Sequence, residues 1–216
     1  MSFRKAIALA ASLFTLAFAA QSQPGPTYQT LSPPQPTEGA GKIEVIEFFW
    51  YGCPHCYTLE PQVNAWVKTL PADVVFKRVH AIPNQSWAVH AAIYYTLESM
   101  GLLEKFHQKV FDAIHKDNIN LTNPKLREEW LAKNGIDVAK YNEVEKSFSV
   151  NSKMKRASQL TVNYKVDGVP RIFVNGRYYT APEFAGAERT FTVVNELVAM
   201  ARKESAAAPA PAAAKK

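Results

Sequence analysis

Two cysteines are the residues of this chain best suited to chemistry. Cys53 and Cys56 are the only cysteines among 216 residues, and they stand three apart in Phe-Phe-Trp-Tyr-Gly-Cys-Pro-His-Cys-Tyr, residues 48–57. Such a pair can be a structural disulfide, part of a metal site, or a disulfide that opens and closes. A structural disulfide stabilises a protein most when it closes a long loop, and this pair encloses almost nothing.

The metal alternative needs further ligands at suitable spacing. Zinc takes four ligands, usually with a second close pair of cysteines or histidines. The histidines outside the motif form no such pair: His80, His90, His107 and His115. We therefore expect no metal and no cofactor, and we favour thiol–disulfide exchange as the chemistry.

The residues between the cysteines indicate how the pair is tuned. Pro54 favours the first position of a helix, which makes Cys53 the N-cap residue. The unpaired N–H groups and the helix dipole at that end stabilise a thiolate on Cys53. Cys56 lies one turn further on and should be less exposed. His55 can donate a hydrogen bond to the thiolate or attract it by charge, although a solvated residue in the helix turn is the alternative.

The surrounding pattern predicts an α/β fold that is interrupted by helices. Residues 43–50 are β-branched and aromatic, as in a strand buried on both faces. The helix that begins at Cys53 should run to about residue 70, with a possible kink at Pro61, and a strand follows at 74–79. Residues 86–164 have helical periodicity instead. Strands return at 171–174 and 177–179, joined by the hairpin pair Asn175-Gly176, and an amphipathic helix covers about 187–202.

Cap residues and apolar periodicity divide the helical stretch further. We expect helices to begin at Ser86, Asn123 and Asp137. Three apolar residues are assigned to the apolar face of the helix that begins at Asp137: Val138, Tyr141 and Phe148. Two more helices are indicated by four-residue or three-residue spacing: Phe106, Val110 and Ile114 in one, and Met154, Ala157 and Leu160 in the other.

The two ends of the chain have a different composition. Residues 1–19 combine Arg4 and Lys5 with a short apolar run and small residues, as in a secretory signal that is cleaved before Ala20. Residues 20–41 are proline-rich and look unstructured apart from a possible strand at 28–31. Residues 204–216 form an Ala/Pro tail that we expect to be flexible. Export implies an oxidising compartment, where a disulfide can persist.

The net charge gives no sign of nucleic-acid binding. The formal charge is +6, and it falls to +2 once Arg4, Lys5, Lys215 and Lys216 at the two ends are set aside. A body this close to neutral lacks the electrostatic footprint of a nucleic-acid-binding protein.

Two motifs together resemble one known family. Glu-Phe-Phe-x-x-x-Cys-Pro-His-Cys begins at Glu47, and Gly-Val-Pro-x-x-Phe-Val-Asn-Gly begins at Gly168. With the helical stretch between them, they are similar to the DsbA family of periplasmic thiol:disulfide oxidoreductases over residues 42–203. The resemblance implies a thioredoxin-like domain at 42–84 and 165–203, split by a helical insertion at 85–164. It also implies that Cys53 forms the mixed disulfide with substrate and that Cys56 resolves it.

The resemblance adds expectations about the substrate site. The Val169–Pro170 bond should be cis and lie beside Cys53, where Val169 offers backbone groups to an extended peptide. Arg171 departs from the small residue that is commoner in the family. It either favours the thiolate and repels basic substrates, or it points to solvent.

A charged pair and an aromatic rim complete the expected site. The resemblance matches Glu47 and Lys77 to a buried acid–base pair under the cysteines, which can shift in pKa and relay protons. The alternative without a functional role is that both residues lie at an open rim of the sheet. Residues 48–51 should divide between the core and an apolar rim around Cys53 that suits unfolded chains.

Partners and alternatives follow from the same resemblance. Substrates would be reduced or unfolded exported polypeptides in the periplasm, a DsbB-like membrane quinone reductase would restore the disulfide, and the protein would be a monomer. An isomerase or reductase of the same superfamily would use the same cysteines, although such isomerases usually carry a dimerisation domain for which residues 21–41 are too short. A peptide-binding module without catalysis would not need two cysteines at this spacing.

Overall fold

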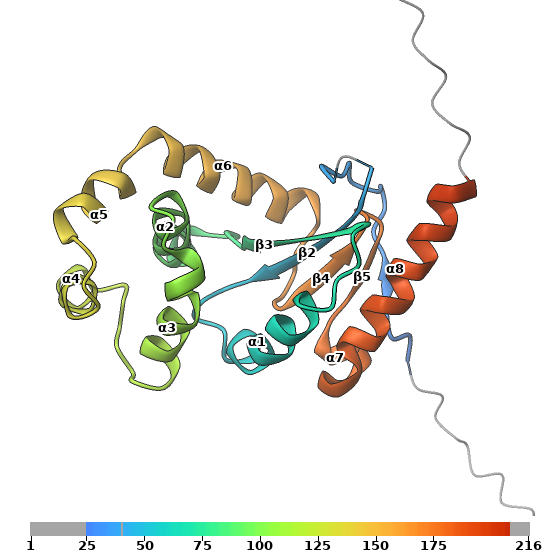
Figure 1. Cartoon of the computed structure of the whole chain (residues 1–216), viewed down its shortest axis with the longest axis horizontal. Coiled ribbons are helices and arrows are strands. Elements are labelled where there is room, and N and C mark those ends of the chain that lie inside the picture. The colour runs from blue at the N-terminus through green and yellow to red at the C-terminus, as the bar shows by residue number, and fades with distance from the viewer. Residues whose placement is uncertain (1–24, 40, 208–216) are drawn as a thin grey trace, which may run out of the picture.

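The computed structural model describes residues 25–39 and 41–207, and shows a five-stranded sheet covered by helices (Figure 1). The strands are β1 (Gln29–Thr30), β2 (Ile43–Phe49), β3 (Val74–His80), β4 (Arg171–Val174) and β5 (Tyr178–Thr180). The helices are α1 (Pro54–Val67), α2 (Gln85–Ser99), α3 (Leu103–His115), α4 (Pro124–Lys133), α5 (Val138–Glu145), α6 (Phe148–Asn163), α7 (Pro182–Ala185) and α8 (Thr190–Ala207). Because α2 to α6 fall between β3 and β4, the predicted α/β fold with inserted helices is confirmed.

Strand β2 is the structural base of the cysteine motif. The sheet order is β1-β5-β4-β2-β3, with β2 parallel to β3 and antiparallel to β4. Every residue of β2 is buried, which agrees with its continuous run of β-branched and aromatic residues. The chain leaves the sheet after Phe49, and Cys53 caps α1 four residues later. A fixed central strand therefore determines where α1 begins.

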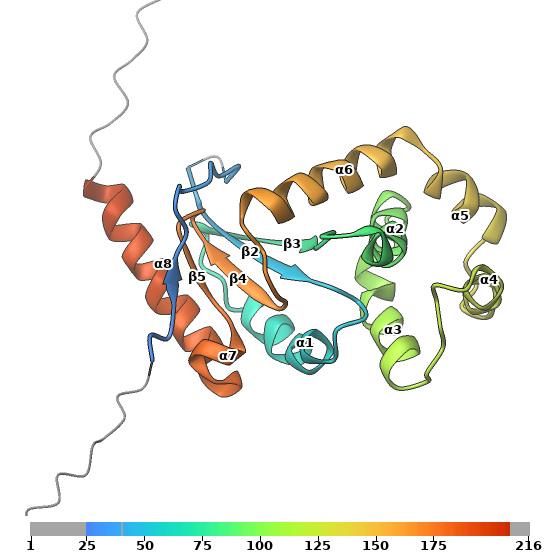
Figure 2. The same cartoon turned by 180° about the vertical axis from the view of Figure 1, so that it is seen from behind.

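Apolar residues cover both faces of the sheet. On one face, Leu59 of α1 and Leu197 of α8 belong to the same buried cluster as Val45 of β2. On the other, the Tyr164 ring at the end of α6 packs 5.3 Å from the Phe48 ring, measured between centroids. Figure 2 shows the same layers, with α6 and α1 on opposite sides of the sheet. Burial of each large apolar side chain stabilises the fold by about 1.5–3 kcal/mol.

The helical segment begins at caps that were mostly predictable. Asn123 and Asp137 accept backbone N–H groups at the starts of α4 and α5, as expected. The predicted cap at Ser86 is wrong by two residues. Asn84 is the N-cap of α2, and its Oδ1 accepts the Ser86 N–H at 3.0 Å. Both residue types can cap a helix, so composition alone could not separate them.

Phe148 does not lie on the helix to which we assigned it. Helix α5 ends at Glu145, and Ser147 caps a separate helix, α6, by accepting the Val150 N–H at 3.3 Å. Phe148 is the first residue of α6 and is 88% exposed. Phe148 is seven residues from Tyr141, the spacing of two residues on one face of a single helix. That spacing gave no sign of the helix boundary between them.

The proline-rich N-terminal segment is more ordered than its composition predicted. Leu31 follows β1 and is buried in the core, and the Gln35 N–H donates to the Gly176 carbonyl at 2.8 Å. The turn at Asn175 and Gly176 has positive φ at both residues. A Cβ at Gly176 would lie 2.0 Å from the Gln35 carbonyl oxygen, so only glycine fits where the two segments cross.

The final helix also extends beyond its predicted end. Helix α8 continues to Ala207, because alanine is the strongest helix former and because Glu204 pairs with Arg177 at 3.3 Å. The rest of the predicted tail and the predicted signal, residues 1–19, lie outside the described residues. Across residues 25–39 and 41–207, none of the helices has the length and apolar character that crossing a membrane requires.

Candidate active site

The two cysteines lie at the start of α1 in different environments. Cys53 is the N-cap residue, and its Sγ accepts the Cys56 N–H at 3.4 Å. Pro54 occupies the first helical position and is exposed, as is His55. Cys53 is 7% exposed and Cys56 only 1%, and both are free thiols. A thiol at the rim and a second buried behind it are arranged for exchange with a larger molecule.

The same arrangement separates the acidities of the two thiols. The pKa of Cys53 falls from 9.0 to about 6, mainly because the Cys56 side chain donates a hydrogen bond to its sulfur. The backbone N–H groups of Cys56 and His55 and then the charge of His55 add to this effect, while burial opposes it. Burial and the neighbouring Cys53 sulfur raise the pKa of Cys56 well above its usual value. Cys53 is therefore the thiolate near neutral pH.

The Val169–Pro170 segment lies beside Cys53, although 116 residues separate them. The predicted cis bond is present, and the Cys53 Sγ lies 3.4 Å from the Val169 carbonyl oxygen, to which it donates a hydrogen bond when it is protonated. A cavity of about 260 Å³ adjoins this contact, between the cis-proline segment and the start of α7. Its lining residues are His55, Val169, Pro170, Arg171, Ala181, Pro182 and Glu183.

Of the two alternatives for Arg171, the one in which it points to solvent is wrong. Its side chain is buried, and the guanidinium contacts Glu183 at 2.7 Å and Asp167 at 3.2 Å and lies over the Phe184 ring. It does not point to solvent. The carboxylates of Glu183 and Asp167 are more than half exposed, so a substrate meets their charge before it meets the cation.

The aromatic run before the cysteines belongs mostly to the core. Phe48, Phe49 and Tyr51 are at most 1% exposed, so the expected division between core and rim places three of the four residues in the core. Trp50 is the member that stays partly exposed, and its ring stacks on Trp87 of α2 at 4.3 Å between centroids. The rim that a substrate can reach is therefore a pair of stacked tryptophans beside the motif.

A charged cluster is buried behind the cysteines, but its composition differs from the predicted pair. Glu47 is 1% exposed and lies 3.3 Å from the Nε of Arg78, its register partner on β3. The Nη2 of Arg78 contacts Glu60 of α1 at 2.8 Å. Burial raises the pKa of Glu47 to about 8, with Arg78 opposing and the charge of Glu60 adding to the rise.

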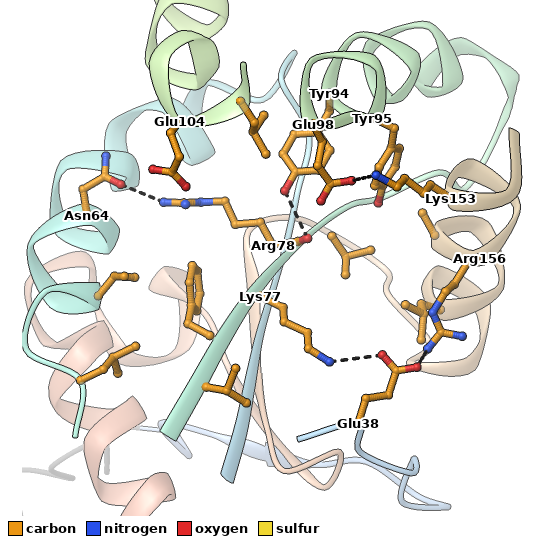
Figure 3. A pocket seen from close by; sticks show the side chains of 18 of the residues that line it. Glu38, Asn64, Lys77, Arg78, Tyr94, Tyr95, Glu98, Glu104, Lys153 and Arg156 are labelled. Carbon is orange, nitrogen blue, oxygen red and sulfur yellow. Dashed lines mark hydrogen bonds and ion pairs between the residues drawn. The ribbon is translucent and has the colours of Figure 1, made fainter. Parts of the chain in front are cut away.

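Lys77 is not part of that cluster, so the predicted pairing of Lys77 with Glu47 is wrong. Successive residues of a strand point to opposite faces, and Figure 3 shows Lys77 and Arg78 leaving β3 in opposite directions. The Lys77 Nζ contacts Glu44 at 2.6 Å and Glu38 at 3.2 Å instead. Lys77 and Arg78 are neighbouring cations in the sequence, and only the register of β2 against β3 shows that Arg78 is the one that lies opposite Glu47.

A fourth polar residue joins the cluster from the helical insertion. His107 of α3 directs its Nε2 toward Glu60 Oε1 at 3.4 Å, while its Nδ1 lies 2.8 Å from the Tyr51 hydroxyl. Sequence reasoning treated His107 only as a missing metal ligand. Its place four residues from Phe111 and three from Val110 marked an inward-facing position, which is the signal that was available. No group of metal-ligating side chains occurs within residues 25–39 and 41–207.

The fold and the site together define a thioredoxin-like dithiol protein. A helix begins at a Cys-Pro-His-Cys motif after a central strand, and a cis-proline segment lies against the first sulfur. The profile of the DSBA-like thioredoxin domain matches residues 72–198. Two relatives named thiol:disulfide interchange protein DsbA are each 42% identical. That of Azotobacter vinelandii aligns over 91% of this chain and 95% of its own, and that of Pseudomonas aeruginosa over 92% and 93%.

Solved structures agree with this assignment. The crystal structure of Pseudomonas aeruginosa DsbA has a TM-score of 0.79 at 40% identity and covers 87% of this chain and 98% of its own. The oxidoreductase NmDsbA1 from Neisseria meningitidis has a TM-score of 0.74 at 28% identity, covering 86% and 96%. The chain belongs to the DsbA family, and it is a thiol:disulfide oxidoreductase.

Proposed function

We propose that this protein donates its Cys53–Cys56 disulfide to reduced polypeptides, through a mixed disulfide at Cys53. The opposed acidities of the two thiols carry this proposal. A thiolate held at Cys53 stabilises the reduced protein, and each pKa unit below ambient pH is worth about 30 mV for a two-electron couple. The reduced form is therefore lower in free energy relative to the oxidised form, and this makes the oxidised protein an oxidant of other thiols.

Two exchanges complete the transfer. A substrate thiolate attacks Cys53 Sγ, so that a bond forms between these sulfurs and the Cys53–Cys56 bond breaks. The Cys56 sulfur keeps the electron pair and takes a proton, because its pKa is high. A second substrate thiolate then attacks the substrate sulfur of the mixed disulfide. Cys53 leaves as a thiolate, a good leaving group at a pKa of about 6, and the substrate keeps the disulfide.

The peptide around the substrate cysteine binds at the cis-proline segment. The Val169 carbonyl lies 3.4 Å from Cys53 Sγ, and the adjoining cavity continues past Pro170 toward α7. Main-chain groups at this position can pair with an extended peptide of any sequence. Recognition through the backbone suits a protein that acts on many unfolded chains.

The place of action and the partners follow from the sequence and the family. The predicted signal at residues 1–19 sends the protein to the periplasm, where newly exported polypeptides still carry free thiols. Restoring the disulfide requires an electron acceptor, for which a DsbB-like membrane quinone reductase is the proposed partner. The protein acts as a monomer, with the partly exposed Val169 at the cavity that Pro170 also lines.

A pair of serine variants tests the proposed roles. Cys53→Ser should abolish the oxidation of a reduced two-cysteine peptide, whereas Cys56→Ser should accumulate a mixed disulfide between Cys53 and the peptide, visible by mass spectrometry. Cys53→Ser protein that still oxidises the peptide would refute the mechanism. Scrambled disulfide substrates give a second readout. Wild-type protein that reshuffles them and leaves reduced peptides unoxidised would be an isomerase, and protein that binds peptide without exchange would be a binding module.

A further inference from the structure

A single buried cation ties the cis-proline segment to α7. Arg171 follows the cis proline, and its side chain is only 7% exposed. Its Nη2 contacts Glu183 Oε1 at 2.7 Å and Asp167 Oδ1 at 3.2 Å. The guanidinium also lies over the Phe184 ring, 5.0 Å from the ring centroid. Arg171 therefore fixes the positions of two carboxylates at the segment that lies against Cys53.

The two carboxylates border different cavities beside that segment. Glu183 lines the cavity of about 260 Å³ at the cis proline, and Asp167 lines a smaller one of about 90 Å³ next to Trp87. Val169 lines both cavities, and its carbonyl oxygen lies 3.4 Å from Cys53 Sγ. An extended peptide that brings its cysteine to Cys53 along Val169 therefore has an acidic side chain within reach in each cavity.

Arg171 does not cancel the acidic character of this rim. Two negative charges face one positive charge, and the positive charge is the buried one, whereas the side chains of Glu183 and Asp167 are 57% and 74% exposed. Each carboxylate gives one oxygen to the guanidinium, and its second oxygen makes no ion pair within the part of the chain that the structure describes. His55 is the remaining titratable side chain in the wall of the larger cavity.

We propose that Glu183 is a specificity-determining residue that selects substrate peptides with a lysine or arginine next to the reacting cysteine. Its free carboxylate oxygen accepts a hydrogen bond from the ammonium or guanidinium group of that residue, and Asp167 offers a second acceptor from the adjoining cavity. Arg171 is a positioning residue that holds both carboxylates. An unpaired Arg171 would repel such peptides, so the carboxylates reverse the effect of the cation. The inference rests on the proposed function, because it names the substrates that the cis-proline segment prefers.

The net charge of the protein would favour the opposite preference. The formal charge of the chain is +6, and it is +2 without the four basic residues near the two ends. Long-range attraction by a positive body favours acidic peptides. A preference for basic peptides would therefore come from the local rim at Glu183 and Asp167, and not from the charge of the molecule as a whole.

A set of reduced two-cysteine peptides tests the inference. The peptides differ only at the residue directly before or directly after the first cysteine, which is lysine, glutamate or alanine. Each peptide is mixed in excess with oxidised protein at low ionic strength, the reaction is stopped with acid, and the free thiols of Cys53 and Cys56 are measured by alkylation and mass spectrometry. A neighbouring charge also changes the reactivity of the peptide thiol. The quantity compared is therefore the lysine-to-glutamate rate ratio of the wild type divided by that of a variant, because the intrinsic reactivity of the peptides cancels.

Glu183→Gln should lower the lysine-to-glutamate ratio about two- to fivefold at one of the two positions or at both, as expected for the loss of one exposed ion pair. Glutamine keeps an oxygen for Arg171, so the wall of the cavity should keep its shape. Sodium chloride at about 0.5 M should remove most of the difference between wild type and variant, because salt screens exposed charges. An unchanged ratio in Glu183→Gln at both positions would overturn the inference.

Glu188→Gln is the matched control. Glu188 is exposed and close to Glu183 in the sequence but does not line the cavity, so its loss changes the net charge equally and should leave the ratio at the wild-type value. An equal fall in Glu188→Gln would show that only net charge matters and would contradict the role of Glu183. Adding Asp167→Asn to Glu183→Gln leaves Arg171 without a carboxylate partner and should turn the preference toward glutamate peptides.

A second measurement covers failure to fold. If circular dichroism shows Glu183→Gln to be unfolded, the wild-type ratio is divided by the ratio for the same peptides reacting with hydroxyethyl disulfide, which is small and neutral. We expect a quotient above one at low salt that falls as salt is added, and a quotient of one or less would overturn the inference. Failure of the proposed function is a separate result, in which the wild type leaves even the alanine peptide reduced.

Discussion

At the scale of single residues, the acidity of Cys53 depends more on Cys56 and the helix start than on His55. The largest contribution to its low pKa is the hydrogen bond from the Cys56 side chain, followed by the two backbone N–H groups, and the His55 charge is the smallest of these. His55 is exposed, so water screens its charge. The second cysteine therefore has two functions, as resolving thiol and as hydrogen-bond donor to the first sulfur.

Three variants separate these contributions. Cys56→Ala removes the donor and should raise the Cys53 pKa by about one unit or more. Cys56→Ser keeps an O–H donor and should raise it less. His55→Ala should give the smallest rise of the three, since only the charge and not the backbone N–H is lost. Thiolate ultraviolet absorbance titrated against pH measures each value, and a larger rise in His55→Ala than in Cys56→Ala would contradict this ranking.

The residues of the site differ in how far the sequence alone could predict them. Cys53 and Cys56 were identified because two cysteines at this spacing have few possible uses, and Pro170 followed from its motif. The resemblance assigned Lys77 to the buried pair, but Arg78 is the next residue of the strand, and a one-residue difference reverses the face to which a side chain points. His107 could not be assigned, since its partner Glu60 is 47 residues away in sequence and only tertiary packing brings them together.

At the scale of elements, the pairing of β2 with β3 decides which charges are buried. Glu47 lies opposite Arg78 in the parallel register, and Arg78 also contacts Glu60 of α1, so one guanidinium joins three elements. Lys77 points to the other face, where its side chain is 32% exposed. The same strand thus carries one cation that supports the site and one that stabilises the region around Glu38 and Glu44.

Neutral substitutions of the two cations should have very different costs. Arg78→Met leaves Glu47 and Glu60 buried without their cation and should lower the free energy of unfolding by about 3–5 kcal/mol. Lys77→Met is the comparison and should cost less, because the Lys77 side chain is 32% exposed and its partner Glu38 is 56% exposed, so that Glu44 is the one buried carboxylate left without its cation. Urea unfolding of both variants measures the difference. Equal costs would show that the cluster does not depend on Arg78.

The elements were predicted best where a local signal fixes them. The N-cap Asn123, the proline after Cys53 and the Asn175-Gly176 turn each act over a few residues, and the structure places elements there. Phe148 was misplaced because helical periodicity carries across a short break. The ordered conformation of residues 25–39 could not be predicted from the sequence, because it depends on contacts with Gly176 and other positions far away in the chain.

At the scale of the whole molecule, the thiolate links redox state to stability. The folded Cys53 pKa of about 6 lies below its ordinary value of 9.0, so the unfolded chain binds more protons in that range. Its contribution to the stability of the reduced protein is fully present above about pH 9 and is lost as pH falls through about 6. The oxidised protein has no thiol to titrate and lacks this contribution.

Unfolding of the two redox forms should therefore diverge as pH rises. At about 1.4 kcal/mol per pKa unit, the Cys53 thiolate adds about 1–2 kcal/mol to the reduced form at pH 7 and almost nothing near pH 4. Urea midpoints of the reduced and oxidised proteins at several pH values measure the gap. We expect the reduced form to be the more stable one at neutral pH. A gap that does not change between pH 4 and pH 8 would show that Cys53 has an ordinary pKa.

The equilibrium with glutathione tests the central claim most directly. Purified protein is incubated near pH 7 with defined ratios of reduced and oxidised glutathione, and the fraction of free Cys53 and Cys56 thiols is measured by alkylation and mass spectrometry. A dithiol oxidant with a stabilised Cys53 thiolate should remain largely reduced even when oxidised glutathione is in excess. Protein that stays oxidised in an excess of reduced glutathione would have a structural or reductase-type disulfide, and this would contradict its assignment as a donor of disulfides.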